Sequence, residues 1–300
     1  MADDIVICPD SYGLSVRGGT CRGVHCVKDA SGRDCIVLWL MDRFCERVLQ
    51  IDAETGAAES IAIEQEMDYA PFASLCSRAG KSYSLFCHWF FEFDPVLKKF
   101  TFAQKVDAGA RLGMGMMEDE AGGIWCTAYP DCHLFRFDPA TREFKSFGQV
   151  SKTDFPQYPY TLVKDGNIIY IGIGFTCGQV VRFDLESGRY ETIVPEELAP
   201  AGEPLKVYRY SDGNIYAGSK SAFFIIRNGK AEAVAEVPAD IVPLTDTRSG
   251  DAGFMMKEFP SGRKLLDFDV KAGTFVTAFQ SSCPSSSNSA SRMLLSLSAP

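Results

Sequence analysis

The feature that most constrains this chain is an internal repeat, in which an apolar residue is followed by Asp at nearly even spacing. The pair occurs at Ile51-Asp52, Phe93-Asp94, Phe137-Asp138, Phe183-Asp184 and Phe268-Asp269. The first four copies are 42, 44 and 46 residues apart, and the last follows a gap of 85 residues. The segment at 227–230 falls halfway along that gap and supplies a sixth copy with a shortened turn. A fixed period of this length is typical of repeat architectures.

Turn chemistry follows each copy of the pair. The segments are Ala53-Glu54-Thr55-Gly56, Pro139-Ala140-Thr141-Arg142, Leu185-Glu186-Ser187-Gly188 and Val270-Lys271-Ala272-Gly273. An Asp side chain accepts hydrogen bonds from backbone amides two residues on, and Gly adopts the left-handed conformation that tight turns need. We therefore interpret the repeated Asp residues as hairpin caps and not as a ring of catalytic carboxylates. The Phe residues before them, Phe93, Phe137 and Phe183, are predicted to be buried between neighbouring repeats.

A second signal precedes each pair and completes the repeat. It is Gly followed by apolar and aromatic residues, at Gly123-Ile124-Trp125, 166–170 and 213–216. One repeat then consists of four short strands joined by tight turns, which is the pattern of a propeller blade. Two amphipathic helices per unit, as an α-solenoid requires, have no room between the turns. The sequence predicts an all-β fold, a β-propeller of six four-stranded antiparallel blades. A seventh blade remains an alternative, because residues 1–20 precede the first complete unit and could form part of another blade.

The repeat also divides the chain. We predict a single propeller domain over residues 1–280, with blades at about 22–65, 68–106, 109–150, 156–196, 203–238 and 248–280. Residues 281–300 contain nine serines. This composition is typical of a disordered tail, and it equally fits the out-of-frame end of a truncated reading frame.

Composition excludes several classes of function. The net charge of −9 and the lack of a basic cluster argue against nucleic-acid and anionic-membrane partners. The N-terminal residues do not resemble a signal peptide and no run of eighteen apolar residues occurs, so we expect a cytoplasmic protein. Eleven cysteines without a Cys-x-x-Cys pair fit a reduced compartment where Cys serves as a small hydrophobe.

Two stretches resemble bacterial propellers of the virginiamycin B lyase and YVTN-repeat type. They are "GNIIYIGIGFTCGQVVRFDLESGRYE" from Gly166 and "GGIWCTAYPDCHLFRFDPATREFK" from Gly122. The resemblance implies the propeller fold. The lyase chemistry of that family uses His and Glu with Mg²⁺, whereas this chain has only His25, His88 and His133 in no matching arrangement. No catalytic residue is therefore carried over.

We letter the four strands of a blade a to d, in chain order from the central channel outwards. In a propeller, the turns between strands b and c and the connections from strand d to the next strand a share one rim at the mouth of the channel. The ligand-binding candidates that this places at the rim are Arg22, His25, His88, Arg111, Tyr129, His133 and Tyr160. Arg binds carboxylates, and Tyr offers a flat apolar face with a polar tip. For two of these residues a purely structural role is the alternative to ligand binding. His25 could be a hydrogen-bonded strand residue, and His88 could be part of a tight turn.

Four cysteines keep step with the repeat. Cys45, Cys87 and Cys177 stand seven residues before the Asp of their blade, and Cys132 stands six before Asp138. They are candidates for a reactive thiol group or a soft-metal site at the b–c rim. The alternative is a small buried residue inherited with the repeat.

The function predicted from these features is a scaffold that binds a small molecule, a carbohydrate or a protein at the b–c rim. No catalysis and no cofactor are evident. The alternative is a propeller lyase or lactone hydrolase acting on a carbohydrate or lactone in the same channel mouth, and only that alternative calls for a divalent metal.

Overall fold

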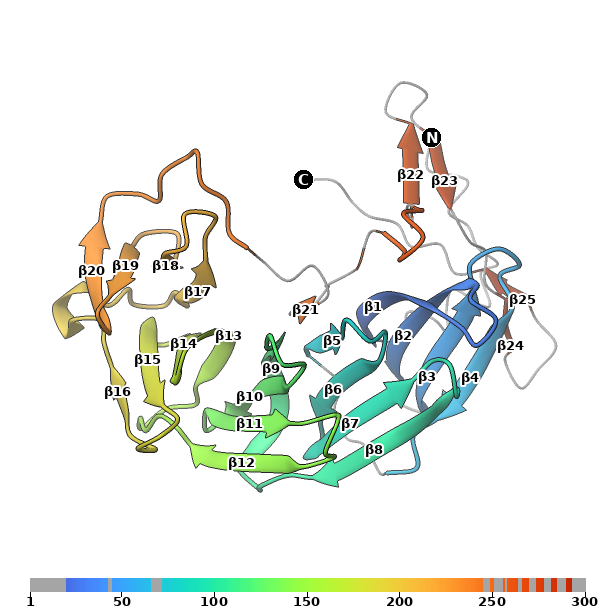
Figure 1. Ribbon diagram of the computed structural model, residues 1–300, viewed down its shortest axis with the longest axis horizontal. Helices are drawn as coiled ribbons and strands as arrows, with labels where there is room; N and C mark the ends of the chain where they lie inside the picture. Colours follow the sequence, from blue (N-terminus) through green and yellow to red (C-terminus); the bar gives the residue numbers. More distant parts are fainter. Residues whose placement is uncertain are drawn as a thin grey trace.

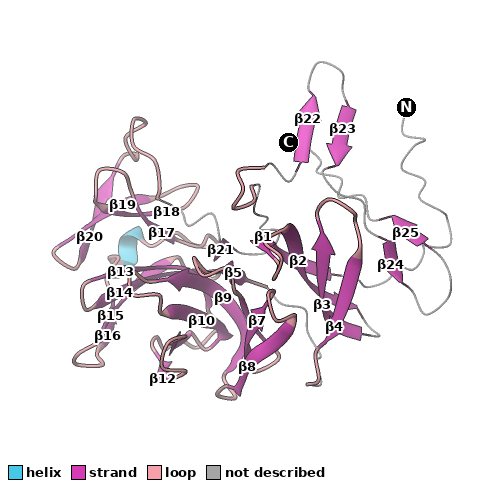
Figure 2. Cartoon of the chain, turned by 45° about the vertical axis from the view of Figure 1, so that its right-hand side comes forward, coloured by secondary structure: helices cyan, strands magenta, loops and turns pink. Residues whose placement is uncertain are grey.

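The computed structural model describes residues 20–42, 45–65, 72–244, 249–250, 256, 258–263, 266–269, 274–277, 282–284 and 290–292. Within these ranges the regular structure is almost entirely β, and the one helix is the short 3-10 turn η2 (Glu196–Leu198) between two sheets (Figure 2). No helix among the described residues is long and apolar enough to cross a membrane.

Five four-stranded antiparallel units, here called blades 1 to 5, lie side by side in an arc (Figure 1). Blades 1, 4 and 5 are separate sheets, whereas the pair Phe86 and Leu112 joins blades 2 and 3 into one larger sheet. Blade 1 consists of β1 (Thr20–Lys28), β2 (Asp34–Asp42), β3 (Cys45–Asp52) and β4 (Ala58–Ala62). Blade 2 consists of β5 (Ser74–Cys76), β6 (Ser82–Phe86), β7 (Trp89–Asp94) and β8 (Lys99–Lys105). Blade 3 consists of β9 (Ala110–Glu118), β10 (Ile124–Pro130), β11 (His133–Phe137) and β12 (Phe144–Gln149).

The last two blades repeat the plan. Blade 4 consists of β13 (Tyr158–Asp165), β14 (Ile168–Gly174), β15 (Gln179–Asp184) and β16 (Tyr190–Thr192). Blade 5 consists of β17 (Lys206–Arg209), β18 (Ile215–Gly218), β19 (Phe223–Arg227) and β20 (Lys230–Val234). The first strand of each blade lies on the inner side of the arc and the fourth on the outer side (Figure 1). The predicted β-propeller fold is confirmed, and the number of blades beyond these five stays a prediction.

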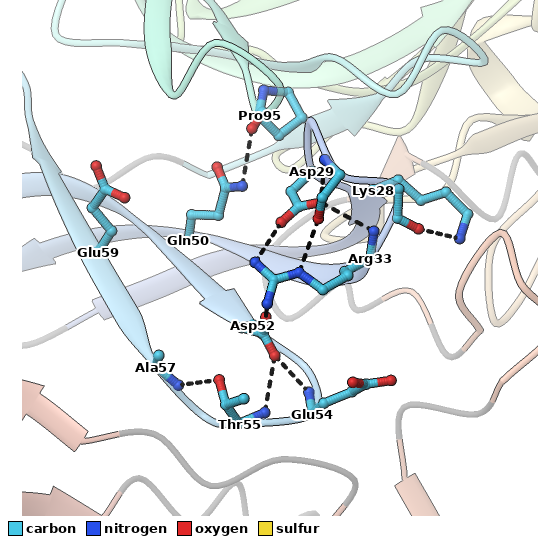
Figure 3. Close-up of polar contacts among 12 residues, drawn as sticks. Lys28, Asp29, Arg33, Gln50, Asp52, Glu54, Thr55, Ala57, Glu59 and Pro95 are labelled. Carbon is cyan, nitrogen blue, oxygen red and sulfur yellow. Dashed lines mark hydrogen bonds and ion pairs between the residues drawn. The ribbon is translucent and has the colours of Figure 1, made fainter.

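The repeated Asp residues cap the hairpins between the third and fourth strands, as predicted. In blade 1, Asp52 Oδ1 accepts the backbone N–H groups of Glu54 and Thr55, both at 2.9 Å (Figure 3). Arg33 lies between Asp52 and Asp29 and forms ion pairs of 2.8 and 3.1 Å with them. Asp94, Asp138 and Asp184 make the same pair of backbone contacts in blades 2 to 4. The shortened turn of blade 5 is also confirmed, because Asn228 and Gly229 both have positive φ between β19 and β20.

Apolar side chains fill the spaces between blades. Phe93, Phe137 and Phe183 are at most 2% exposed, as predicted. Phe137 of blade 3 packs on blade 2, with ring centroids 4.4 Å from Phe102 and 5.5 Å from Phe90. Burial of aromatic side chains removes large apolar surfaces from water, and it therefore stabilises the contacts between blades.

A buried carboxylate also joins blades 2 and 3. The Glu92 side chain has no exposure and accepts hydrogen bonds from Tyr83 at 2.8 Å and from Arg142 at 2.6 Å. Arg142 comes from the hairpin of the neighbouring blade, and its guanidinium lies 5.1 Å from the Phe137 ring. Because a buried charge is tolerated only when it is paired and hydrogen-bonded, this contact fixes the two blades against each other.

The described C-terminal residues only partly follow the predicted sixth blade. The turn at 259–263 has the hydrogen bonds of the other first-to-second-strand turns, with Phe259 N–H donating to Arg263 O at 2.8 Å. It lies against blade 1, where the Met256 N–H donates to Val24 O at 2.9 Å. β21 (Ser249–Gly250) pairs with β5, while β22 (Leu266–Asp269) and β23 (Thr274–Thr277) pair with each other. Two short paired strands, β24 (Ser282–Pro284) and β25 (Ala290–Arg292), lie in the Ser-rich segment for which the sequence predicts disorder.

Candidate functional site

Two-residue turns place several of the residues predicted to bind a ligand or a metal at the b–c rim. Cys87-His88 joins β6 to β7 and Asp131-Cys132 joins β10 to β11. Cys87, His88 and Cys132 have φ of 51°, 65° and 52°, the left-handed region that tight hairpins require. His88 is therefore part of a tight turn, as the alternative interpretation predicts. Its side chain is half-buried at the rim.

Two histidines at this rim carry an unsatisfied nitrogen. His88 Nδ1 and His133 Nδ1 are buried and have no hydrogen-bond partner among the described residues. Burial lowers the pKa of His133, and it outweighs the opposing effect of Asp107 and Asp131. His133 therefore lies close to two carboxylates, and its buried Nδ1 has no hydrogen-bond partner among the described residues.

His25 does not belong to this rim surface. It is fully buried between blades 1 and 2, where Nδ1 is 2.7 Å from Ser82 Oγ and Nε2 is 3.1 Å from Ser74 Oγ. Ser82 Oγ also accepts the Trp39 indole N–H at 2.6 Å. This arrangement matches the alternative of a hydrogen-bonded strand residue, and a ligand at the mouth has no access to His25.

Aromatic rings from three blades gather at the mouth and form what we call the aromatic platform, made of Phe72, Tyr129, Tyr158, Tyr160 and Phe175. The Tyr158 ring centroid is 4.6 Å from Tyr129, 6.0 Å from Tyr160 and 5.6 Å from Phe175. Tyr160 in turn lies 6.3 Å from Phe72, which precedes β5. The four rings other than Phe175 are half-buried, while Phe175 is 53% exposed. The platform is thus a chain of ring contacts that links blades 2, 3 and 4, in which Tyr158 and Tyr160 are nearly parallel and the other neighbouring pairs are tilted by 39° to 58°.

The strand that carries the two central tyrosines is held from both sides. Thr127 Oγ1 of blade 3 donates to the Pro159 carbonyl at 2.8 Å, and Thr161 Oγ1 accepts the Val207 N–H of blade 5 at 2.7 Å. Gly115 allows this approach, because an added Cβ would lie 3.0 Å from the Tyr160 carbonyl. The pairing of β13 with β14 shifts at Tyr160, between Pro159 and Thr161. Such a bulge re-aims a side chain, and here the Tyr158 and Tyr160 rings lie within 16° of parallel.

A cation lies directly on the platform. Lys206, the first residue of β17, places Nζ 5.7 Å from the Tyr160 ring centroid. Arg111 is half-buried at the start of β9, and its carbonyl accepts the His88 N–H at 3.4 Å. Arg22 lies in β1, but its side chain is outside the described residues.

The four candidate thiols do not form a described site. Cys87 and Cys132 are buried, Cys177 is partly exposed, and the Cys45 side chain lies outside the described residues. Burial raises the pKa of Cys132 to about 12, so its thiolate is scarce at neutral pH. The described part of the chain contains no group of three or more His, Cys, Asp or Glu placed to hold a metal ion.

Native-state thiol labelling should separate these cysteines. We expect Cys177 to react with a chromogenic disulfide reagent in the folded protein, because its side chain is partly exposed. Cys87 and Cys132 should react only on unfolding, since buried thiols are inert. Peptide mapping by mass spectrometry identifies the labelled residues. Rapid native labelling of Cys132 would contradict the packing described here.

The sequence pointed to Tyr129 and Tyr160 as site candidates but not to Phe72, Phe175 and Lys206. Phe175 follows β14 in the b–c loop of blade 4 and Lys206 opens the inner strand of blade 5, so the repeat register alone could have placed both at the rim. Their proximity to Tyr158 and Tyr160 depends on how neighbouring blades pack, and the repeat does not contain that information.

Comparison with known proteins shows the fold. No protein-family model and no curated protein matches the chain. The solved structure of virginiamycin B lyase from Staphylococcus aureus aligns with a TM-score of 0.51 at 14% identity, covering 76% of this chain and 73% of that chain.

Two further structures give the same result. A catalytically inactive variant of virginiamycin B lyase from Staphylococcus aureus, solved with quinupristin, aligns at TM-score 0.52 and 14% identity, covering 78% of this chain and 74% of the other. A streptogramin B lyase structure aligns at TM-score 0.50 and 14% identity, covering 89% and 92%. The chain is therefore a β-propeller that shares its fold with virginiamycin B lyase.

Proposed function

We propose that this propeller is a scaffold that binds a small molecule at the mouth formed by the b–c turns and d–a connections. The observation that carries the proposal is the aromatic platform. Its rings come from three blades, and Phe175 is exposed to 53%. Ligand sites are commonly lined by aromatic side chains with a few polar groups that fix orientation, and His133, His88 and Lys206 supply such groups here.

The platform is also rigid before a ligand arrives. Two hydrogen bonds between threonine hydroxyl groups and backbone atoms, from Thr127 to Pro159 and from Val207 to Thr161, hold β13 between blades 3 and 5. A surface that is ordered in advance loses little conformational entropy on binding, which favours affinity.

A fragment screen by thermal shift tests this proposal. We expect wild-type protein to yield aromatic fragments that raise its melting temperature, and Tyr158→Ala to lose these shifts. Tyr190→Ala is the matched control, because Tyr190 is a 37% exposed tyrosine on the outer strand β16. Equal loss in both variants, or fragments that bind Tyr158→Ala as well as wild type, would exclude the platform as the binding site.

A second candidate is a lyase acting in the same mouth. It is favoured by the unsatisfied Nδ1 atoms of His88 and His133 at the rim and by the fold shared with virginiamycin B lyase. Incubation with quinupristin, followed by chromatography, tests it. Consumption of quinupristin that His88→Gln or His133→Gln abolishes would support a lyase, and an unchanged quinupristin peak with wild-type protein would remove that activity from consideration.

A further inference from the structure

We propose that Met256 is a site of reversible oxidation that fastens the chain to the inner edge of β1. A peroxide converts its thioether into a sulfoxide, and the oxidised side chain releases this edge. The inference goes beyond the proposed binding function and uses no residue of the aromatic platform. It depends on the contacts that Met256 makes with β1 and on the apolar side chains around it.

Three contacts hold Met256 against β1. Its N–H donates to Val24 O at 2.9 Å, and its Sδ accepts the Cys26 backbone N–H at 3.4 Å. Its carbonyl accepts the Cys26 thiol at 3.6 Å. Residues two apart in a strand point their backbone groups to the same edge, and β2 lies along the other edge of β1. Met256 therefore covers the free edge of the innermost strand of blade 1 (Figure 1).

The Met256 side chain packs where two groups of apolar residues meet. One group contains Val27 and Trp39, and the other contains Cys26 and Phe259. An uncharged thioether suits this position, because methionine fills irregular apolar gaps. A sulfoxide is polar, and a polar group is costly among apolar side chains unless it is hydrogen-bonded. Oxidation therefore favours a state in which the side chain turns to water and the contact of Sδ with β1 is lost.

Exposure and ionisation select Met256 as the reacting sulfur in this region. Met256 is half-buried, whereas Met114 and Met116 are only 1% and 6% exposed. Cys26 is the other sulfur at this contact, and burial raises its pKa to about 12. The thiolate, which is the form that reacts with peroxides, is therefore scarce at neutral pH. A thioether needs no ionisation to react.

The reaction balances with hydrogen peroxide as the oxidant. The sulfur lone pair attacks one peroxide oxygen, so an S–O bond forms while the O–O bond breaks. The departing hydroxide takes the proton of the transferred oxygen and leaves as water. Sulfur loses two electrons and the peroxide gains them.

The turn at 259–263 is held to blade 1 by separate contacts. Ser261 Oγ donates to Asp34 Oδ2 at 2.5 Å, and the Arg263 guanidinium donates to the Ala53 carbonyl at 3.2 Å. Neither contact involves the methionine sulfur. Oxidation should therefore loosen the inner edge of β1 and leave this turn attached.

Limited treatment with hydrogen peroxide, followed by peptide mapping, tests the site. We expect Met256 to gain an oxygen atom at least about tenfold faster than Met114 and Met116. Fragment ions separate Met256 from the adjacent Met255. If Met256 is as resistant as the two buried methionines, the inference is wrong.

Hydrogen exchange measured by nuclear magnetic resonance tests the release. In the oxidised protein the Cys26 amide should exchange at least about fivefold faster than in the untreated protein. The Phe259 amide, which donates to Arg263 O, should keep its rate. Treatment with a methionine sulfoxide reductase should restore slow exchange at Cys26. Oxidation of Met256 without any change at Cys26 would overturn the inference.

Two leucine variants supply the controls. Met256→Leu is close to isosteric and should fold. It lacks the sulfur acceptor, so the Cys26 amide should exchange faster than in wild type before treatment, and peroxide should add nothing. Met117→Leu is the matched control, because Met117 is half-buried in β9 and packs between blades 3 and 4. It should keep the peroxide response, and a response that persists in Met256→Leu would contradict the assignment.

Discussion

Replacing Phe137 with alanine should lower the free energy of unfolding by about 3–5 kcal/mol, the usual cost of deleting an aromatic side chain from a packed core. The Phe137 side chain is fully buried, and its ring lies against Phe102 and Phe90 of the preceding blade. The cavity would open at the boundary between blades 2 and 3, where the rigid sheets can collapse only partly.

Urea unfolding monitored by circular dichroism measures this change. Tyr190→Ala serves as the control, because a substitution at an exposed position of the outer strand should shift stability by no more than about 0.5 kcal/mol. A midpoint for Phe137→Ala that coincides with wild type would show that the third strand of blade 3 is placed wrongly.

Lowering the pH should destabilise the protein through His25, and this is the second large effect. Burial lowers the pKa of His25 to about 3 from an ordinary value of 6.5. The unfolded chain therefore binds a proton at His25 between these two values while the folded chain does not. This contribution to stability is complete above pH 6.5 and is lost as the pH falls towards 3, at about 1.4 kcal/mol per pH unit.

The hydrogen bonds around His25 explain why protonation is unfavourable. Ser82 Oγ accepts the Trp39 indole N–H and lies 2.7 Å from Nδ1 of His25, while Ser74 Oγ lies 3.1 Å from Nε2. A neutral imidazole meets these two hydroxyl groups with one donor and one acceptor, whereas a protonated ring has two donors. A second proton would therefore remove the hydrogen bond that the ring accepts and add a charge inside the core.

Unfolding free energies measured from about pH 7 to about pH 4, for wild type and for His25→Gln, test the prediction. The variant should be less stable at neutral pH and should show a smaller slope with pH, because Gln does not titrate. Carboxylates contribute to the slope in both proteins, so the difference between the two curves isolates His25. Parallel curves would mean that His25 does not titrate as its burial implies.

The sequence was a good guide to local structure and a poor one to contacts between blades. Asp94 and Asp138 could be recognised as hairpin caps because their partners are only two and three residues away. Asn228-Gly229 was equally clear, since few other pairs adopt positive φ at two successive positions. Phe137 was predicted to be buried because an apolar residue recurs before each Asp.

Contacts between distant residues were not predictable in this way. Glu92 is paired with Arg142, fifty residues away, and nothing in the local pattern distinguishes Glu92 from a surface carboxylate. His25 was predicted to lie at the rim because it belongs to an inner strand. In the fold its ring is directed at Ser74 and Ser82 of the next blade, and the repeat does not reveal that contact. Lys206 joined the platform only when blades 4 and 5 were placed side by side.

The central claim, that the mouth of this propeller binds its ligand on the aromatic platform, is tested most directly by nuclear magnetic resonance. In a titration with an aromatic fragment that raises the melting temperature of the wild type, we expect saturable shifts of the backbone amides of Tyr158, Tyr160 and Phe175. The amides of Tyr190 and Lys145 on the outer strands should not move. Saturable shifts confined to the outer strands, or a spectrum that does not change up to saturating concentrations of the probe, would contradict it.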